Sequence, residues 1–439
     1  MGMKISYAKT VPVVGEFDVV VCGGGPAGIG AAIAAAEAGA KCALVERFGF
    51  LGGMATAGFV DPMSEFSYNG HRVIGGIPWR FVQELLACKG AIVEEPRCNV
   101  SFDPEVYKIV AHRMVSQAGV TLFMNSFMAD AITENNRVEA VVITGKQGLR
   151  ALKGRYFIDA TGDGDLAAYA GVEMLPQIRD RQPGTLCFEL SGVDTSTERM
   201  HIIHQRNHRF NHQAVFVREK FLELRKQGVH VPKFGGPWLC TTVNPGTITV
   251  NMSRAAMDAT DDLDYQQAEA SMREDVMTLV ALLKEHIEEF KNCQLAATAT
   301  VAGIRESRRI KGMHVMTGLE YVSAHKFEDA IARACHPVDI HLPGDEGQEL
   351  SFPADAGYIP FSSLVPEKVT NLLAAGRMIS ADADAFAAIR VQAPCMETGQ
   401  AAGLAAALCC RRGGIAVQEL PAEAVVAAVK AAGSLDIEP

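Results

Sequence analysis

The apolar positions of the chain recur with two different periods, and their order predicts alternating strands and helices. Phe17–Cys22 is a run of β-favouring residues interrupted only by Asp18, which is typical of a strand buried on both faces. Small apolar residues from Ile29 to Ala38 then predict a helix that ends at Gly39, and Cys42–Val45 predicts a second strand. This order indicates the start of a doubly wound α/β fold.

Two later patterns predict further helices. Leu263–Phe290 carries apolar residues at steps of three and four, and Asp261 or Asp262 precedes it as a candidate N-cap, so we expect an amphipathic scaffold helix without chemistry. Near the end of the chain, Ala387–Leu408 begins with an isolated Arg390 and continues mostly in alanine, glycine and leucine. Such a helix buries little apolar surface by itself, so burial alone does not explain why its residues are small.

A glycine motif connects the first strand to the first helix. Gly23, Gly25 and Gly28 form G-x-G-x-x-G directly after the strand, and Glu46 ends the second strand. The first glycine allows a tight turn, the second lets the backbone approach a pyrophosphate, and the third lets helix and strand pack closely. The helix N-terminus then faces the pyrophosphate, and the acid at position 46 accepts hydrogen bonds from a ribose. The candidate dinucleotide-binding residues here are Gly23, Gly25, Pro26, Ala27, Gly28 and Glu46.

Three later segments indicate which dinucleotide the chain binds. These are RFGFLGGMATAG (47–58), RYFIDATGDGDLAAYAG (155–171) and YIPFSSLVPEKVTNLLAAGRMIS (358–380). Together with the first motif and the last helix, they resemble the FAD-dependent oxidoreductases of the flavoprotein class with two dinucleotide-binding domains. The resemblance implies FAD as the cofactor. It adds as expected FAD-binding residues Arg47, Gly52, Gly53, Met54, Ala129, Ala160, Thr161, Gly162, Gly376, Arg377, Thr398, Gly399, Gln400 and Ala401.

The resemblance also suggests a reason for the small-residue helix. In that class the last helix points its N-terminus at the flavin pyrimidine ring, where a positive helix end stabilises charge on the reduced flavin. Close approach would require the small residues around Gln400. The alternative is a helix packed tightly in the core, and both interpretations can hold together. The class often has an acid after the late glycine; here Arg377 stands there, so Asp382 or Asp384 could supply the acid.

These patterns predict an α/β protein with a discontinuous, Rossmann-like FAD-binding core and an inserted α+β substrate domain. We assign residues 1–60, 105–171 and 357–439 to the FAD-binding domain. Residues 61–104 and 172–356 form the substrate domain, with Gly303–Gly312 at the domain junction. A chain of 439 residues is long enough for two cores.

Composition excludes several kinds of partner. The net charge is −10, and no block of lysine and arginine is dense enough to follow a nucleic acid. No run of 18 apolar residues and no secretory pattern occur, so we expect no membrane partner and a cytoplasmic location. The eleven cysteines include no C-x-x-C, and we assign no metal. A second G-x-G-x-x-G is missing, so we expect no dedicated NAD(P)H domain.

Candidate catalytic residues lie where the chain returns to the nucleotide-binding fold. The segment ACHPVDIHLPG (334–344) contains His336, Asp339 and His341. If it is a strand, Asp339 and His341 share one face, and the carboxylate could orient the imidazole as a proton acceptor. The alternative is a buried structural histidine; we favour His341 over His336 as the base. Arg390 could orient an anionic substrate or form a salt bridge with a nearby acid.

Two other clusters have both a structural and a functional interpretation. GIRESRRIKG (303–312) gathers three arginines around Glu306, either as an ion-paired brace between domains or as an anion pocket for a carboxylate substrate. His201, His204, His208 and His212 share one helical face, which could bind a metal, form a cationic patch or contact another subunit.

We therefore expect an FAD-dependent dehydrogenase or oxidase that transfers a hydride between a small polar or anionic metabolite and flavin N5, with His341, Arg390 and His336 as catalytic candidates. One alternative is a reductase or monooxygenase driven by diffusing NAD(P)H. The other is a flavin-binding subunit of an electron-transfer complex. A homodimer is compatible with the sequence.

Overall fold

A computed structural model describes residues 5–201, 214–342 and 347–435. Its main sheet has seven strands among these residues. The order is β7 (Thr121–Phe123), β2 (Cys42–Val45), β1 (Val13–Cys22), β10 (Gly148–Asp159), β9 (Arg137–Gly145) and β8 (Phe127–Glu134), with β19 (Leu372–Ala374) also paired to β10. The pairs among β7, β2, β1, β10 and β19 are parallel, whereas β9 and β8 are antiparallel. The expected doubly wound core is therefore present.

The predicted first elements are confirmed, with shifted ends. The strand β1 begins at Val13 rather than Phe17, because its first residues pair with β10. Helix α1 (Pro26–Glu37) begins three residues before Ile29, with Pro26 in its first turn, where a missing N–H costs no intrahelical bond.

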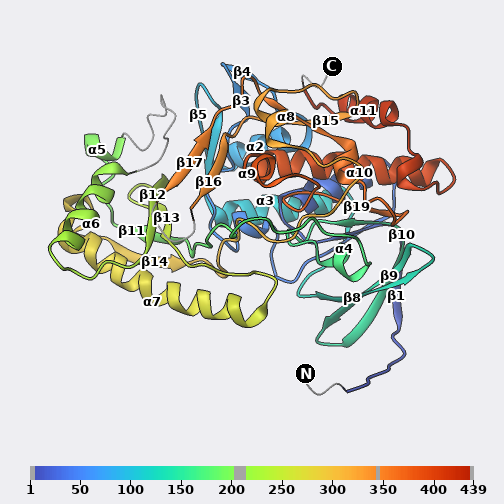
Figure 1. Cartoon of the computed structure of the whole chain (residues 1–439), viewed down its shortest axis with the longest axis horizontal. Coiled ribbons are helices and arrows are strands. Elements are labelled where there is room, and N and C mark those ends of the chain that lie inside the picture. The colour runs from blue at the N-terminus through green and yellow to red at the C-terminus, as the bar shows by residue number, and fades with distance from the viewer. Residues whose placement is uncertain (1–4, 202–213, 343–346, 436–439) are drawn as a thin grey trace.

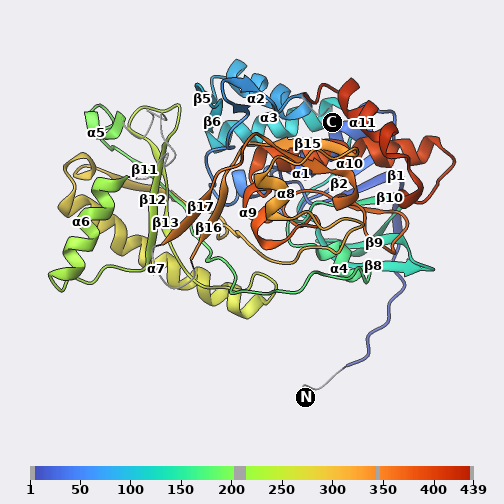
Figure 2. The ribbon, with the colours of Figure 1, turned by 45° about the horizontal axis from the view of Figure 1, so that its top comes forward.

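The small residues of the last long helix, α10 (Gln392–Arg411), lie against α1. A Cβ added to Gly399 would lie 1.9 Å from Ala27 O, and one added to Gly403 would lie 2.2 Å from Ala31 O. A Cβ on Gly30, from the side of α1, would meet Met396 O at 2.2 Å. The two backbones approach so closely that only glycine fits at these positions, so tight packing accounts for the composition of α10 (Figures 1 and 2).

Further elements complete this first unit. They are α2 (Gly76–Ala87), α3 (Pro104–Gln117), α4 (Asp165–Tyr169), α8 (Gly318–Val322), α9 (Ala383–Ile389), α11 (Ala422–Ala431) and the strand pairs β3 (Ser67–Tyr68) with β4 (His71–Arg72), β5 (Ala91–Glu94) with β6 (Asn99–Phe102), β15 (Ala330–Ala334) with β18 (Gly357–Pro360), and β16 (Val338–His341) with β17 (Gln348–Ser351). Among the described residues, short 3₁₀ turns of this unit lie at Gly53–Ala55, Phe361–Leu364 and Val417–Glu419, and another at Glu288–Phe290 belongs to a second unit.

A second unit has its own sheet and core. Its four antiparallel strands run in the order β12 (Phe234–Thr241), β13 (Ile248–Ser253), β11 (Phe188–Ser191), β14 (Gln294–Thr298). The helices of this unit are α5 (Glu198–His201), α6 (Val215–Lys226) and α7 (Asp262–His286). Asp261 caps α7 as expected, accepting hydrogen bonds from Leu263 N and Asp264 N. This unit lies at the left in Figures 1 and 2, with α7 running toward the first unit.

The two hydrophobic cores divide the chain differently from the expected domains. Apolar residues of 61–104 and of 310–356 pack into the first core, whereas the second core comes from residues 186–304 with Phe59. The reason is that amphipathic α2 buries Ile77, Phe81 and Leu85 beside α10 and α3. Among the described helices, none combines the length and the apolar character needed to cross a membrane.

Candidate active site

A cleft opens where β1, β2 and β10 end. Its lining includes Gly23, Gly24, Gly25, Pro26, Ala27, Glu46, Arg47, Phe48, Gly53, Met54, Ala160, Thr161, Gly162, Asp163, Ala375, Gly376 and Arg377. Gly23 has a φ of +103°, which allows the turn from β1 into α1. No side chain caps the N-terminus of α1, so its first N–H groups and its positive dipole end are available to a phosphate. These features fit the pyrophosphate of FAD.

Glu46 lies at the far side of this cleft and is buried. Its carboxylate accepts hydrogen bonds from Gly24 N at 2.7 Å and Phe48 N at 2.9 Å. Burial raises the pKa of Glu46, while the hydrogen bonds from Phe48 and Gly24 oppose that rise. Each carboxylate oxygen has a second lone pair, which fits a ribose hydroxyl. Glu46 therefore closes the glycine turn and lines the cleft, a position that fits contact with a nucleotide.

The late glycine lies opposite α1. Gly376 has a φ of +93°, and its N–H donates to Thr398 Oγ1 at 3.2 Å. The guanidinium of Arg377 is paired with Asp163 at 2.5 Å, and both residues line the cleft. The acid beside the late glycine is thus Asp163. Asp382, proposed from sequence for this place, instead caps α9, accepting from Asp384 N and Ala385 N.

Several expected FAD-binding residues do not line the cleft. They are Gly28, Gly52, Ala129, Thr398, Gly399, Gln400 and Ala401. Gly28 and Gly52 shape it from behind, since a Cβ on Gly28 would lie 1.7 Å from Gly23 O and Gly52 N donates to Gly24 O at 2.8 Å. Ala129 lies in β8.

The flavin-facing end of α10 differs from the expectation. The helix begins at Gln392, six residues before Thr398, so Thr398–Ala401 lie about 9 Å further along its axis. Gln400 Oε1 accepts from Ile77 N at 2.6 Å in the core. The α10 residues that do line the cleft are Gln392 and Cys395.

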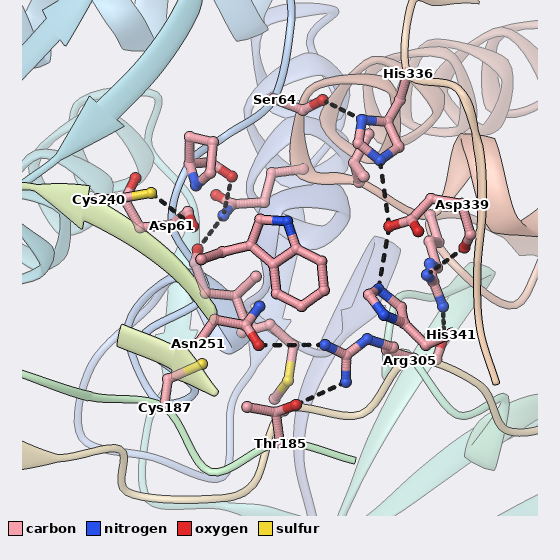
Figure 3. Close-up of a pocket in the computed structure, with 18 of the residues that line it drawn as sticks. Asp61, Ser64, Thr185, Cys187, Cys240, Asn251, Arg305, His336, Asp339 and His341 are labelled. Carbon is pink, nitrogen blue, oxygen red and sulfur yellow. Dashed lines mark hydrogen bonds and ion pairs between the residues drawn. The ribbon is translucent and has the colours of Figure 1, made fainter. Parts of the chain in front are cut away.

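A second cavity of about 240 Å³ adjoins the cleft. The two share the lining residues Met54, Ile304, Arg377, Arg390 and Gln392. Both units contribute to its wall, with Trp238, Cys240 and Asn251 from the second sheet and His336, Asp339 and His341 from around β16 (Figure 3). A molecule in this cavity would lie next to the one in the cleft.

The predicted His–Asp–His group is assembled at this cavity. His341 Nε2 lies 3.1 Å from Asp339 Oδ2, and His336 Nε2 lies 3.8 Å from the same oxygen. His336 Nδ1 lies 3.1 Å from Ser64 Oγ on the other side (Figure 3). The strand β16 places Asp339 and His341 on one face, as the alternation of a strand requires.

Asp339 and His341 both have a lowered pKa, for different physical reasons. Burial, together with the positive charge of Arg305, lowers the pKa of His341 to about 3, although Asp339 opposes this shift. Burial alone would raise the pKa of Asp339, but His341, a hydrogen bond from His336 and the charge of Arg390 keep it well below its usual range. At neutral pH the group is therefore a neutral imidazole hydrogen-bonded to a carboxylate.

The neutral state of His341 predicts a pH-dependent stability. In the unfolded chain a histidine takes up a proton below about pH 6.5, whereas His341 in the folded protein stays neutral down to about pH 3. Stability is therefore lost as the pH falls through this window, by about 2 kcal/mol between pH 7 and pH 5. Urea unfolding at both values should show this loss in the native protein and not in His341→Gln. Equal losses in both proteins would contradict the assignment.

Arg390 holds the two cavities' shared wall together. Its Nη1 donates to Arg305 O at 3.3 Å and its Nη2 to Asp339 O at 2.9 Å. Arg390 thus positions the backbone at Arg305 and at Asp339, and it also lines both cavities.

In the arginine-rich segment 303–312, two arginines form the expected ion-paired brace and one lies at a cavity, as expected for an anion pocket. Arg308 pairs with Asp165 at 2.5 Å and Arg309 with Glu306 at 3.7 Å, so these two brace the fold. Arg305 alone of the three lines the second cavity. The histidine stripe falls on residues 201–212, and the side chains of His201, His204, His208 and His212 lie outside the described part of the chain.

The cavity also contains residues that sequence patterns did not single out. They are Asp61, Ser64, Thr185, Trp238 and Asn251. Asp61 and Ser64 share one loop, and the other three come from separate segments of the chain, so no local spacing marks the set. Asp163 could have been found, because it directly follows the Ala160-Thr161-Gly162 strand end.

The geometry agrees with what known proteins show. The model of a family described as FAD dependent oxidoreductase matches residues 18–430. A thiamine thiazole synthase of Aeropyrum pernix is 32% identical over 158 residues, which cover 33% of this chain and 54% of that protein. A digeranylgeranylglycerophospholipid reductase 2 of Methanopyrus kandleri is 29% identical over 202 residues, covering 42% of this chain and 48% of that protein. The chain thus spans about half the length of these curated relatives.

Among solved structures, similarity extends over most of the chain at low identity. A geranylgeranyl bacteriochlorophyll reductase-like protein from Thermoplasma acidophilum aligns with a TM-score of 0.46 and 14% identity, covering 95% of this chain and 83% of that one.

Proposed function

The chain belongs to the FAD dependent oxidoreductase family, and from that premise we propose that it oxidises a small polar or anionic metabolite by hydride transfer to flavin N5, as a dehydrogenase or an oxidase. The observation that carries this proposal is the adjoining pair of cavities, one fitted to FAD and one containing the His–Asp–His group. A separate substrate cavity also supports an enzyme over an electron-transfer subunit.

The roles of the residues follow from their contacts. Bound FAD supplies a hydride acceptor. Ionised Asp339 selects the His341 tautomer that carries its proton on Nε2, which leaves Nδ1 as the proton acceptor for a C–OH or C–NH group of the substrate. The hydride and this proton together account for the two electrons and two hydrogens that the substrate loses. Ser64 holds His336 against the other side of the carboxylate.

Arg390 contributes by position. Its hydrogen bonds to the carbonyls of Arg305 and Asp339 keep Arg305 at a constant distance from Asp339 and the proton acceptor His341. The glycine turn and Glu46 hold the cofactor in the cleft. Because the cleft and the second cavity share lining residues, the flavin would lie next to the substrate.

Replacing His341 by alanine tests this assignment. We expect flavin reduction by an active metabolite, found by anaerobic screening of hydroxy acids, amines and sugars, to slow at least about 100-fold, because general-base catalysis typically supplies that much. Stopped-flow absorbance measures the rate, and the FAD content should stay unchanged. The control His325→Ala changes an exposed histidine outside both cavities and should keep the native rate. An unchanged rate in His341→Ala would remove His341 from the mechanism.

A further inference from the structure

Arg305 and Arg390 line the substrate cavity and Arg254 is buried next to Arg305, and none of the three has an ion-paired acid among the described residues. Among the described residues, no carboxylate lies within ion-pairing distance of Arg254, Arg305 or Arg390. The other arginines of this wall are paired, Arg97 with Glu65 at 2.7 Å and Arg377 with Asp163. The first three therefore form no direct ion pair with a carboxylate within the described chain.

Neutral oxygens hold two of these arginines side by side. Arg305 Nη1 donates to Thr185 Oγ1 at 2.8 Å, and its Nη2 donates to Asn251 Oδ1 at 3.3 Å (Figure 3). Arg254 donates to the same two oxygens from behind. Arg254 is buried, lies over the ring of Trp238, and has an Nη2 atom that is buried without a hydrogen-bond partner among the described residues.

Such an arrangement is costly unless an anion completes it. Burial lowers the pKa of Arg305 to about 10, with Arg390 contributing, and burial with the charge of Arg305 also lowers the pKa of Arg254. The guanidinium of Arg305 still carries its charge at neutral pH. Like charges held together in a buried site create a positive potential that favours an anion at the accessible face of the group. That face belongs to Arg305, which lines the cavity and is partly exposed.

The residues that line the cavity indicate which class of anion it would bind. The negative charge of Asp339 offsets part of the positive charge of the three arginines. Its side-chain oxygens accept from His341 and Gln348, and one negative charge leaves an excess of positive charge at this wall. The rest of the wall includes the apolar side chains Met54, Val60, Trp238, Ile304 and Leu350. A planar guanidinium binds a planar carboxylate well, and an apolar wall suits the remainder of the molecule.

We propose that the substrate is a small carboxylic acid with an apolar body, whose carboxylate binds at Arg305, supported by Arg254, while its oxidisable carbon lies toward the wall shared with the FAD cleft. This assignment rests on the proposed function and names the substrate class for the same site. Arg305 is then the residue that selects acids over their neutral analogues.

Benzoate and benzamide test this selection, since they share shape and differ in charge. We expect benzoate to raise the melting temperature of the holoprotein and to perturb its flavin absorption spectrum, with a Kd at least about tenfold below that of benzamide. In Arg305→Gln this ratio should fall to near one. The control is Arg273→Gln, which removes an exposed arginine also bound to neutral oxygens, those of Thr298 and Thr300, but outside both cavities. It should keep the native ratio.

Three outcomes would overturn the inference. These are equal affinities for benzoate and benzamide in the native protein, an unchanged ratio in Arg305→Gln, and chloride at equal concentration displacing benzoate, which would indicate a site for inorganic anions. A protein that holds FAD and is reduced by a neutral alcohol would keep the proposed function and lose this inference. A protein that never binds FAD would lose the proposed function, whereas the melting-temperature comparison would still report on Arg305.

Discussion

Gly28→Ala should be isolated without flavin. A Cβ at this position would lie 1.7 Å from the carbonyl oxygen of Gly23, and that atom belongs to backbone, so it has no flexible end that could turn away. The turn itself is held by the bond from Gly23 N to Val45 O at 2.8 Å. Relieving the clash therefore moves the N-terminus of α1 away from the pyrophosphate. We expect FAD affinity to fall at least about 100-fold and the free energy of unfolding to fall by about 3 kcal/mol.

The matched control lies at the other end of the same helix. Gly39 has a φ of +89° and open space where a Cβ would stand. Gly39→Ala should cost about 1 kcal/mol from backbone strain and keep its FAD. Fluorescence titration with FAD and urea unfolding of both variants measure the two quantities. Native FAD affinity in Gly28→Ala would contradict the placement of the cofactor at this turn.

Gly399→Val should lose the fold rather than only the cofactor. Its added atoms would meet Ala27 O, at 1.9 Å for the Cβ alone, where α10 crosses α1 in the centre of the first unit. Because both partners are helix backbone, the helices must separate, and we expect a loss of more than about 4 kcal/mol in the free energy of unfolding. The variant should be insoluble or melt well below the native protein.

This outcome also separates the two explanations of the small-residue helix. If position 399 served mainly to approach the flavin, the variant would be a stable protein that lacks FAD. Gly413→Ala is the control, since Gly413 follows α10, has a φ of +83° and has no heavy atom near its Cβ position. We expect it to melt close to the native protein.

The features that were predicted correctly from sequence depend on residues that lie close together in the chain. The order strand, glycine turn, helix, strand and acid lies within about thirty residues, so Glu46 and the glycine turn could be placed without knowing the rest of the fold. Asp339 and His341 were placed on one face because a strand alternates its side chains with period two.

The parts that sequence did not predict depend on contacts between distant segments. Asn251 and Thr185 touch Arg305 although they lie more than fifty residues from it in the chain, and no periodicity marks either. From the sequence, Thr398–Ala401 were expected to meet the flavin, but α10 begins six residues earlier, with Pro394 inside its first turn. A proline in the first turn breaks no intrahelical hydrogen bond, so the helix already begins at Gln392.

The domain boundaries illustrate the same limit. Segments 61–104 and 310–356 were both assigned to the inserted substrate domain, yet their apolar faces belong to the first core. Which core an amphipathic helix such as α2 joins is decided by the surface available to it, here that of α10, and not by its place in the chain.

The visible absorption spectrum of the purified protein, recorded as isolated, after addition of FAD, and again anaerobically with NADPH, tests the central claim most directly. The two adjoining cavities predict one bound FAD per chain and a flavin band that NADPH does not bleach, since electrons come from the organic substrate. No flavin band even after FAD is supplied would contradict the assignment of the cleft. A band that NADPH bleaches rapidly would contradict the proposed direction of the reaction and point to a reductase or monooxygenase.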